Sequence, residues 1–167
     1  IRGITLLDGG SWHIVPTASK NVRIEDVNIL GKVITGDGID VVGCEDVVIR
    51  NCFVRANDDC ISIKAEEYQD PSGCTDVRRV LVEDCLFWNA EFGNALEIGY
   101  ETRCDEITDV VFSNCDIVHC QYEGNQSGGV LTKHNADHAH VHNISYEDIR
   151  IEDAQEKCID IKTLDAK

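Results

Sequence analysis

Apolar and polar residues alternate along most of the chain, and the alternation follows a recurring unit. Each copy has two apolar positions two residues apart, a break, and two further apolar positions; the copies start at Val22, Val47, Val80, Val110 and Ile144. A second, shorter alternating stretch follows each copy, at Ile39–Val41, Ile61–Ile63, Leu96–Ile98, Val130–Thr132 and Ile159–Ile161. Alternation with period two predicts β-strands, so each copy supplies at least two of them.

The variable spacing between copies favours one kind of solenoid. No window shows the 3.6-residue apolar period of an amphipathic helix, and leucine-rich repeats would be more regular in length. Coils of a β-helix absorb insertions while their strands stay in register. We therefore predict an all-β, right-handed parallel β-helix of about five to six coils. An earlier partial coil is expected in residues 1–16, with four side chains facing inward: Ile4, Leu6, Trp12 and Ile14.

Superposing the copies places most cysteines in interior columns. One column holds Val27, Cys52, Cys85, Cys115 and Ile149, and another holds Gly38, Cys60, Ala95, Gly129 and Cys158. A buried thiol behaves as a small apolar side chain, so stacked free thiols are favoured over a disulfide or metal framework. One alternative pairs Cys74 with Cys104, and the odd total of nine leaves at least one cysteine without an intramolecular partner.

Acidic residues precede two of the shorter stretches on one shared template. Superposition places Asp37 over Asp59, with Asp58 beside them. Neighbouring coils lie about 4.8 Å apart, and like charges that close keep one carboxyl protonated toward neutral pH. A protonated acid beside ionised carboxylates is what inverting glycoside hydrolysis requires. Ordinary Asp-Gly and Asn-Asp turns and a calcium site remain alternatives.

Composition and charge narrow the range of partners. The 167 residues suit one domain, and we expect residues 1–167 to be a single β-helix taken from a longer one. The formal net charge of −16 argues against nucleic acid, whose phosphates need Lys and Arg. No apolar run reaches the roughly 18 residues that cross a membrane. Unpaired strands at both ends of the coil would permit a homo-oligomer.

The motifs resemble those of the β-helical glycoside hydrolases, over nearly the whole chain. The polygalacturonase family (family 28) carries Asn-Thr-Asp, Asp-Asp, Gly-His-Gly and Arg-Ile-Lys. The corresponding stretches here are Thr35-Gly36-Asp37, Asp58-Asp59, Gly93-Asn94-Ala95 and Leu131-Thr132-Lys133. The three aspartates and Lys133 match, whereas Asn94 replaces the histidine and Leu131 the arginine.

Other stretches are similar to the related dextranases and isopullulanases (family 49). These are Asp37-Gly38, Asn57-Asp58-Asp59 with Lys64 after it, and Trp88-Asn89 ahead of Gly93-Asn94. The Gly-Trp of that branch is Gly99-Tyr100 here. In polygalacturonases the arginine and lysine are regarded as contacts to a substrate carboxylate, and Leu131 cannot make that contact. The chain thus keeps the acidic trio without the complete uronate-binding pair.

The resemblance implies an inverting glycoside hydrolase acting on a polysaccharide or oligosaccharide, extracellular or periplasmic, without metal or other cofactor. Asp58 would be the general acid, and Asp37 and Asp59 would position and activate water. Neighbours on the same sheet are candidates for substrate contact: Lys64, Asn94, Glu97, Tyr100, Lys133 and His134. The alternative from another class is a non-catalytic carbohydrate-binding or structural β-helix. A polysaccharide lyase is a third reading, but no basic residue aligns as its base.

Four histidines fall between His134 and His142. His140 and His142 would share one strand face and, with Asp137 or His138, could bind zinc. No spacing template for zinc ligands supports this, so a polar loop leading into the next strand is the favoured interpretation.

Overall fold

The computed structural model describes residues 1–65, 75–121, 131–135 and 139–163. These residues form strands and turns, and the strands are β1 (Thr5–Leu7), β2 (Lys20–Glu25), β3 (Asn28–Leu30), β4 (Ile39–Val42), β5 (Glu45–Arg50), β6 (Phe53–Ala56), β7 (Ile61–Ala65), β8 (Val77–Glu83), β9 (Leu86–Asn89), β10 (Leu96–Thr102), β11 (Glu106–Ser113), β12 (Asp116–Cys120), β13 (Leu131–Asn135), β14 (His140–Glu147), β15 (Arg150–Ile151) and β16 (Ile159–Thr163). Among the described residues, no helix has the length and apolar character needed to cross a membrane.

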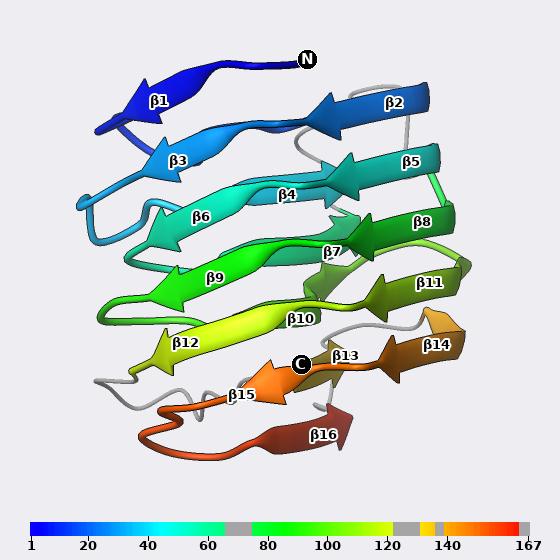
Figure 1. Ribbon diagram of the computed structural model, residues 1–167. Helices are drawn as coiled ribbons and strands as arrows, with labels where there is room; N and C mark the ends of the chain where they lie inside the picture. The colour runs from blue at the N-terminus through cyan, green and yellow to red at the C-terminus, as the bar shows by residue number, and fades with distance from the viewer. Residues whose placement is uncertain (66–74, 122–130, 136–138, 164–167) are drawn as a thin grey trace.

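The strands form three parallel sheets stacked along one axis. Their orders are β1-β3-β6-β9-β12-β15, β16-β13-β10-β7-β4 and β14-β11-β8-β5-β2, so each coil contributes one strand to each sheet. In Figure 1 the chain runs leftward in front, through strands such as β2 and β3, and returns rightward behind in β4 as the coil descends. This path is right-handed. The predicted right-handed parallel β-helix is therefore confirmed.

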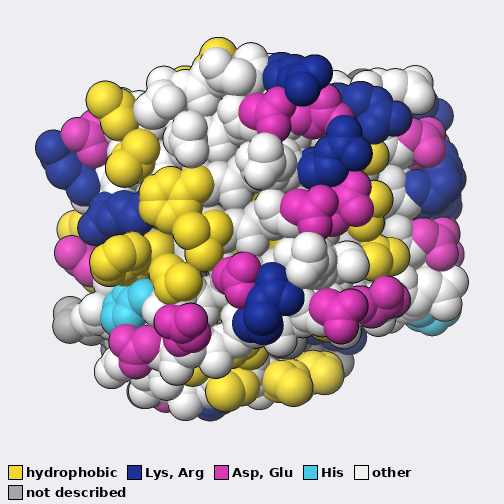
Figure 2. All heavy atoms as spheres, in the orientation of Figure 1, with side chains coloured by type: hydrophobic (Ala, Val, Ile, Leu, Met, Phe, Trp, Pro, Cys, Tyr) yellow, Lys and Arg dark blue, Asp and Glu magenta, His cyan; other side chains and the backbone are white. Residues whose placement is uncertain are grey.

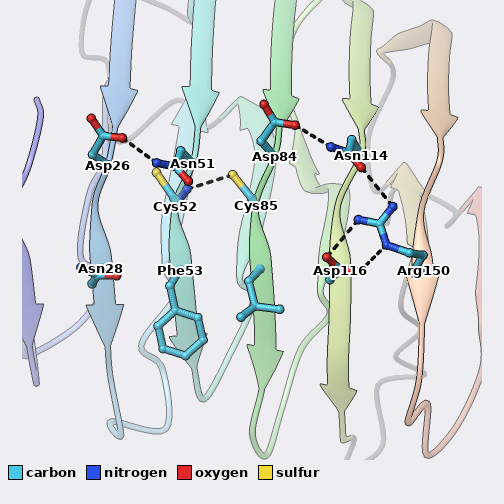
Figure 3. Close-up of a pocket in the computed structure, with 11 residues that line it drawn as sticks. Asp26, Asn28, Asn51, Cys52, Phe53, Asp84, Cys85, Asn114, Asp116 and Arg150 are labelled. Carbon is cyan, nitrogen blue, oxygen red and sulfur yellow. Dashed lines mark hydrogen bonds and ion pairs between the residues drawn. The ribbon is translucent and has the colours of Figure 1, made fainter.

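The longer stretch of each repeat, such as 46–54, forms two strands that meet at a corner. An Asp or Asn with φ between 49° and 54° stands at each corner: Asp26, Asn51, Asp84, Asn114 and Asp148. These residue types tolerate the left-handed region better than other side chains. Figure 3 shows Asp26, Asn51, Asp84 and Asn114 in a row on successive coils, with Asn51 Nδ2 donating to Asp26 Oδ1 at 2.7 Å and Asn114 Nδ2 to Asp84 Oδ1 at 2.6 Å.

The thiol column runs beside this stack inside the coil. Cys52, Cys85 and Cys115 are buried and free, and the backbone N–H of Cys52 donates to Cys85 Sγ at 3.4 Å. The prediction of stacked free thiols is confirmed for these residues. Cys158 was expected inside but is exposed, because β16 is the end strand of its sheet within the part of the chain that the structure describes. Gly129, Val130 and Cys74 lie outside the described residues, so the pairing of Cys74 stays a prediction.

The first residues form a partial coil, as expected, but not all of their predicted inward side chains are inside. Ile14 is buried and Leu6 packs against the core. Ile4 is exposed, since β1 is the first strand of its sheet. Trp12 is only half-buried and lies next to a lysine of the neighbouring coils, as described below.

Charged side chains on the outer face join successive coils. Figure 2 shows acidic and basic groups side by side on this face. Arg50 Nη2 lies 2.8 Å from Glu25 Oε1, Arg79 Nε lies 2.7 Å from Asp46 Oδ1, and Arg150 pairs with Asp116. Exposed pairs of this kind contribute little to the stability of the fold.

Candidate active site

The three predicted aspartates lie together, just before the N-terminal ends of two neighbouring strands. Asp37 precedes β4, and Asp58 and Asp59 precede β7, which pairs with β4 in parallel. Carboxylate oxygens of all three lie within 4.8 Å of one another. Asp37 is 3% exposed and Asp59 7%, whereas Asp58 is only partly buried. Of the three, Asp58 is therefore the carboxyl most open to a ligand.

Small residues allow these loops to stack so closely. A Cβ on Gly38 would lie 2.3 Å from Val54 Cγ1 and 2.4 Å from the Cys60 carbonyl oxygen. The Gly38 N–H donates to the Asp59 carbonyl at 2.8 Å, and the Cys60 N–H donates to the Asn94 carbonyl at 2.9 Å. The Asp-Gly sequence thus lets one coil rest directly on the next, so that Asp37 sits over Asp59.

Lys64 supplies the positive charge of the cluster. Its Nζ lies 3.3 Å from Asp37 Oδ2, 3.7 Å from Asp40 Oδ2 and 3.7 Å from Glu101 Oε2. The same ammonium lies 3.8 Å from the ring centroid of Trp12, a cation–π contact. Lys64 is buried, so its partners here are carboxylates of the protein; its predicted substrate contact stays a prediction.

Asn94 fixes the carboxylate of Asp59. Its backbone N–H donates to Asp59 Oδ1 at 2.6 Å, and its Nδ2 donates to the same oxygen at 3.0 Å. The amide Nδ2 also reaches Glu97 Oε2 at 2.5 Å. Asn94 and Glu97 are both buried, so the geometry gives them a positioning role, and contact with substrate stays a prediction for both.

Burial and mutual repulsion raise the pKa values of the carboxyls. Burial, with the charge of Asp59, raises the pKa of Asp58 to about 7. Burial, Asp40 and Asp59 raise the pKa of Asp37 far above its usual range, and burial with Glu97 does the same for Asp59. At neutral pH the trio therefore holds at least one proton, which is what a general acid requires.

Lys64 opposes this effect. Burial lowers the pKa of its ammonium, but the carboxylates around it, Asp40 first, raise the pKa by more, so the group stays charged. A fixed positive charge favours the ionised form of the nearest carboxyl. The cluster can therefore hold a proton on one carboxyl and a negative charge on another.

The remaining predicted contacts lie on β10 and β13. Tyr100 is 43% exposed, and Lys133 is partly exposed and sits in register with Ile98. His134 belongs to β13, but its side chain lies outside what the structure describes.

Sequence reasoning missed Asp40 and Glu101 as partners of Lys64, and it missed the contacts of Trp12 and Gly93. Asp40 lies inside a strand where its neighbours are apolar, and this lone acidic residue was an available signal. Trp12 was assigned to the core by alternation alone. Gly93 has φ +68°, and a Cβ there would lie 2.4 Å from Asp58 Oδ1 and 2.5 Å from Asp59 Oδ1. Nothing in the local sequence indicates that contact.

Comparison with known proteins shows the family of the chain. The model of "Glycosyl hydrolases family 28" matches residues 1–165. A probable polygalacturonase from Vitis vinifera is 35% identical over 72 residues, covering 41% of this chain and 15% of the relative. A polygalacturonase from Brassica napus is 25% identical over 133 residues, covering 77% and 29%. The chain thus spans less than a third of either relative, and no solved structure matches. Since the family model covers nearly every residue, the chain belongs to glycosyl hydrolases family 28.

Proposed function

We propose that this chain carries the acid–base site of an inverting glycoside hydrolase that cleaves a polysaccharide. The observation that carries the proposal is the convergence of Asp37, Asp58 and Asp59 within 4.8 Å beside a buried ammonium. Asp58 is the most open of the three, and with a pKa of about 7 it donates its proton to the leaving oxygen. Asp37 and Asp59 hold and activate the attacking water, and the charge of Lys64, which lowers the pKa of both carboxyls, favours the ionised form that a base needs.

The spacing suits a water held between two carboxylates. Inverting enzymes usually separate acid and base by roughly 6.5–9.5 Å to admit water, and retaining pairs by about 5–5.5 Å. The oxygens here are closer than the first range, but one water forms hydrogen bonds of about 2.7–2.8 Å and can bridge oxygens up to 4.8 Å apart. The water then lies between Asp37 and Asp59, and the third carboxyl remains available as the acid.

The position of Lys64 argues against a calcium site at the same carboxylates. A divalent ion bound by the trio would lie beside an ammonium that is already 3.3 Å from Asp37 Oδ2. The ion and the Lys64 ammonium would then be two positive charges against the same carboxylate, and they would repel strongly in a buried site. The lysine supplies the countercharge that calcium would otherwise provide.

We infer that the substrate is a pectin-type glycan, and that the part of the glycan bound near β13 carries few free carboxylates. The relatives above are named polygalacturonases, and the family resemblance assigns an arginine and a lysine to the uronate. This chain has Leu131 and Lys133 there, so only a single-point contact remains where bidentate Arg would bind more tightly. We therefore expect methyl-esterified pectin to be cleaved faster than polygalacturonate.

The test is sugar release from methyl-esterified pectin, polygalacturonate and dextran, with the first product anomer followed by NMR. We expect cleavage of pectin with inversion at the anomeric carbon. Retention would contradict the water-activating role of Asp37 and Asp59, and cleavage of dextran alone would favour the family 49 pattern. Glycan binding without cleavage would favour a non-catalytic binding module, which the burial of Asp37 and Asp59 also fits.

Replacing Gly93 by Ala is expected to lower kcat about 100-fold. The added methyl would displace the carboxylates of Asp58 and Asp59, and a shift of about 1 Å costs a factor of that size. Steady-state rates on the preferred glycan check this. Gly3→Ala is the matched control: Gly3 has the same φ of +68°, but nothing lies within 4 Å of its added Cβ. Equal rates for the two variants would show that the carboxylate positions do not limit turnover.

A further inference from the structure

A second cluster of ligand-type side chains lies on a different sheet from the aspartates, on neighbouring strands β11 and β14. Glu106 is directly opposite His140 in register, and Thr108 is opposite His142. His140 and His142 are two residues apart and so project from the same face of the strand. One ligand atom from each of Glu106, His140 and His142 lies within 4.8 Å of the others.

The contacts inside this cluster are close. His142 Nε2 lies 2.6 Å from Glu106 Oε1, and the rings of His140 and His142 stack with centroids 4.3 Å apart. A contact of 2.6 Å between a ring nitrogen and a carboxylate oxygen needs a proton between them. A divalent metal ion can take the place of that proton, because metal binding displaces protons from its ligands.

Two further residues hold the ligands in orientation. Arg78 donates from Nε to Glu106 Oε2 at 2.9 Å, which leaves Oε1 facing the histidines, and because the Arg78 side chain is 35% exposed, water screens its charge as it cannot screen that of the buried Lys64. Thr108 Oγ1 lies 3.4 Å from His142 Nδ1, so that nitrogen can donate to the hydroxyl and leave Nε2 to bind a metal. Supporting contacts of this kind orient metal ligands in known sites.

We propose that Glu106, His140 and His142 bind Zn²⁺ through two imidazole nitrogens and one carboxylate oxygen, with a fourth position open to water. Zn²⁺ prefers this mixture at bond lengths of about 2.0–2.2 Å. Calcium and magnesium prefer sites made of oxygen atoms, which this cluster does not offer. Sequence reasoning considered His140 and His142 with Asp137 or His138; the structure supplies Glu106 instead, and Asp137 and His138 lie outside the described residues.

The ion would join two successive coils. Glu106 belongs to β11 and the histidines to β14, so binding ties one coil to the next, independently of the carbohydrate site. The side chains of Glu106 and His142 are 27% and 32% exposed, which leaves a path for the ion and room for the two side chains to move apart and take it between them. The net charge of −16 also favours a cation. We therefore expect Zn²⁺ to stabilise the folded chain.

Titration calorimetry of the metal-free chain with zinc chloride tests the proposal, with thermal unfolding in parallel. We expect one Zn²⁺ per chain and a rise in Tm of about 5–10 °C at a free concentration 100 times Kd. His140→Ala and His142→Ala should abolish binding, and Glu106→Gln should weaken it about 10- to 100-fold. Calcium and magnesium in excess should not displace the zinc.

His119→Ala is the matched control. His119 pairs with Asp153 at 2.8 Å on another sheet, and its replacement should leave zinc affinity unchanged. Absence of zinc binding by the unaltered chain would overturn the proposal. Binding that survives in His140→Ala and His142→Ala would place the ion elsewhere in the chain, and would overturn it equally. Neither result depends on glycan cleavage, so the test is separate from that of the hydrolase.

Discussion

Asp58→Asn is expected to lower kcat for glycan cleavage by about 10²–10⁴-fold, the usual contribution of a positioned general acid. An amide at this position keeps the shape of the side chain but has no acidic proton for the leaving oxygen. The Asp58 side chain is also the most open of the trio, so its replacement should leave packing intact. Initial rates and thermal unfolding measured on the same preparation check both halves of this expectation.

The pH profile adds an independent readout of the same role. Burial raises the pKa of Asp58 to about 7, and a general acid acts only while protonated, so the rate should fall as the pH rises above 7. Asp105→Asn removes the same charge from an exposed side chain and should keep both the rate and the profile. A fully active Asp58→Asn enzyme would exclude Asp58 as the acid.

The repeat made most of the fold predictable. Alternation fixed which side chains point inward, and superposition of the copies then placed Cys52, Cys85 and Cys115 in one column and Asp37 over Asp59. Both inferences need only that successive coils stack in register. Register is strongly specified in this chain because a shift by one residue would turn every buried side chain outward.

Other features depend on contacts that no repeat encodes. The corner at Asn51 divides the stretch 46–54 into two strands, at the break in the apolar alternation between Ile49 and Cys52. Trp12 follows the same alternation as the core, but a buried ammonium beside it provides a cation–π partner. Glu106 is more than 30 residues from the histidines it meets. In each case the partner comes from another coil. Because the loops of the coils differ in length, superposing the repeats does not align the two partners.

The close burial of several carboxyls makes the stability of this fold depend on pH. Asp37, Asp40 and Asp59 are buried close together, and each therefore has a raised pKa. A carboxyl whose pKa is raised in the folded state stabilises the fold below its ordinary pKa of about 4 and loses that contribution as the pH rises through the raised value. Lys64 limits the loss by favouring the ionised form.

Of the substitutions proposed for this chain, removal of the Lys64 ammonium should lower the free energy of unfolding the most. We expect Lys64→Met to lower the free energy of unfolding by about 3–5 kcal/mol at pH 8, because breaking a buried ion pair leaves its partners uncompensated. Methionine keeps an unbranched apolar side chain of similar length, so the change reports mainly on charge. The ammonium of Lys64 lies 3.7 Å from Asp40 Oδ2, and the pKa of Asp40, raised to about 7, leaves this carboxyl ionised at pH 8, so it loses its countercharge.

The deficit should be smaller at pH 5. Without Lys64 the pKa values of Asp37 and Asp40 rise further, so these carboxyls are protonated at pH 5 and cost less than at pH 8. Urea unfolding at the two pH values measures the difference. Lys32→Met is the control, since Lys32 is 73% exposed in its pair with Asp8 and should change stability by less than about 1 kcal/mol. Lys64→Met could instead lower the free energy of unfolding no more than the control does at both pH values. That result would mean that the buried carboxyls are protonated with or without Lys64. The ammonium would then not be what allows one of them to act as a base.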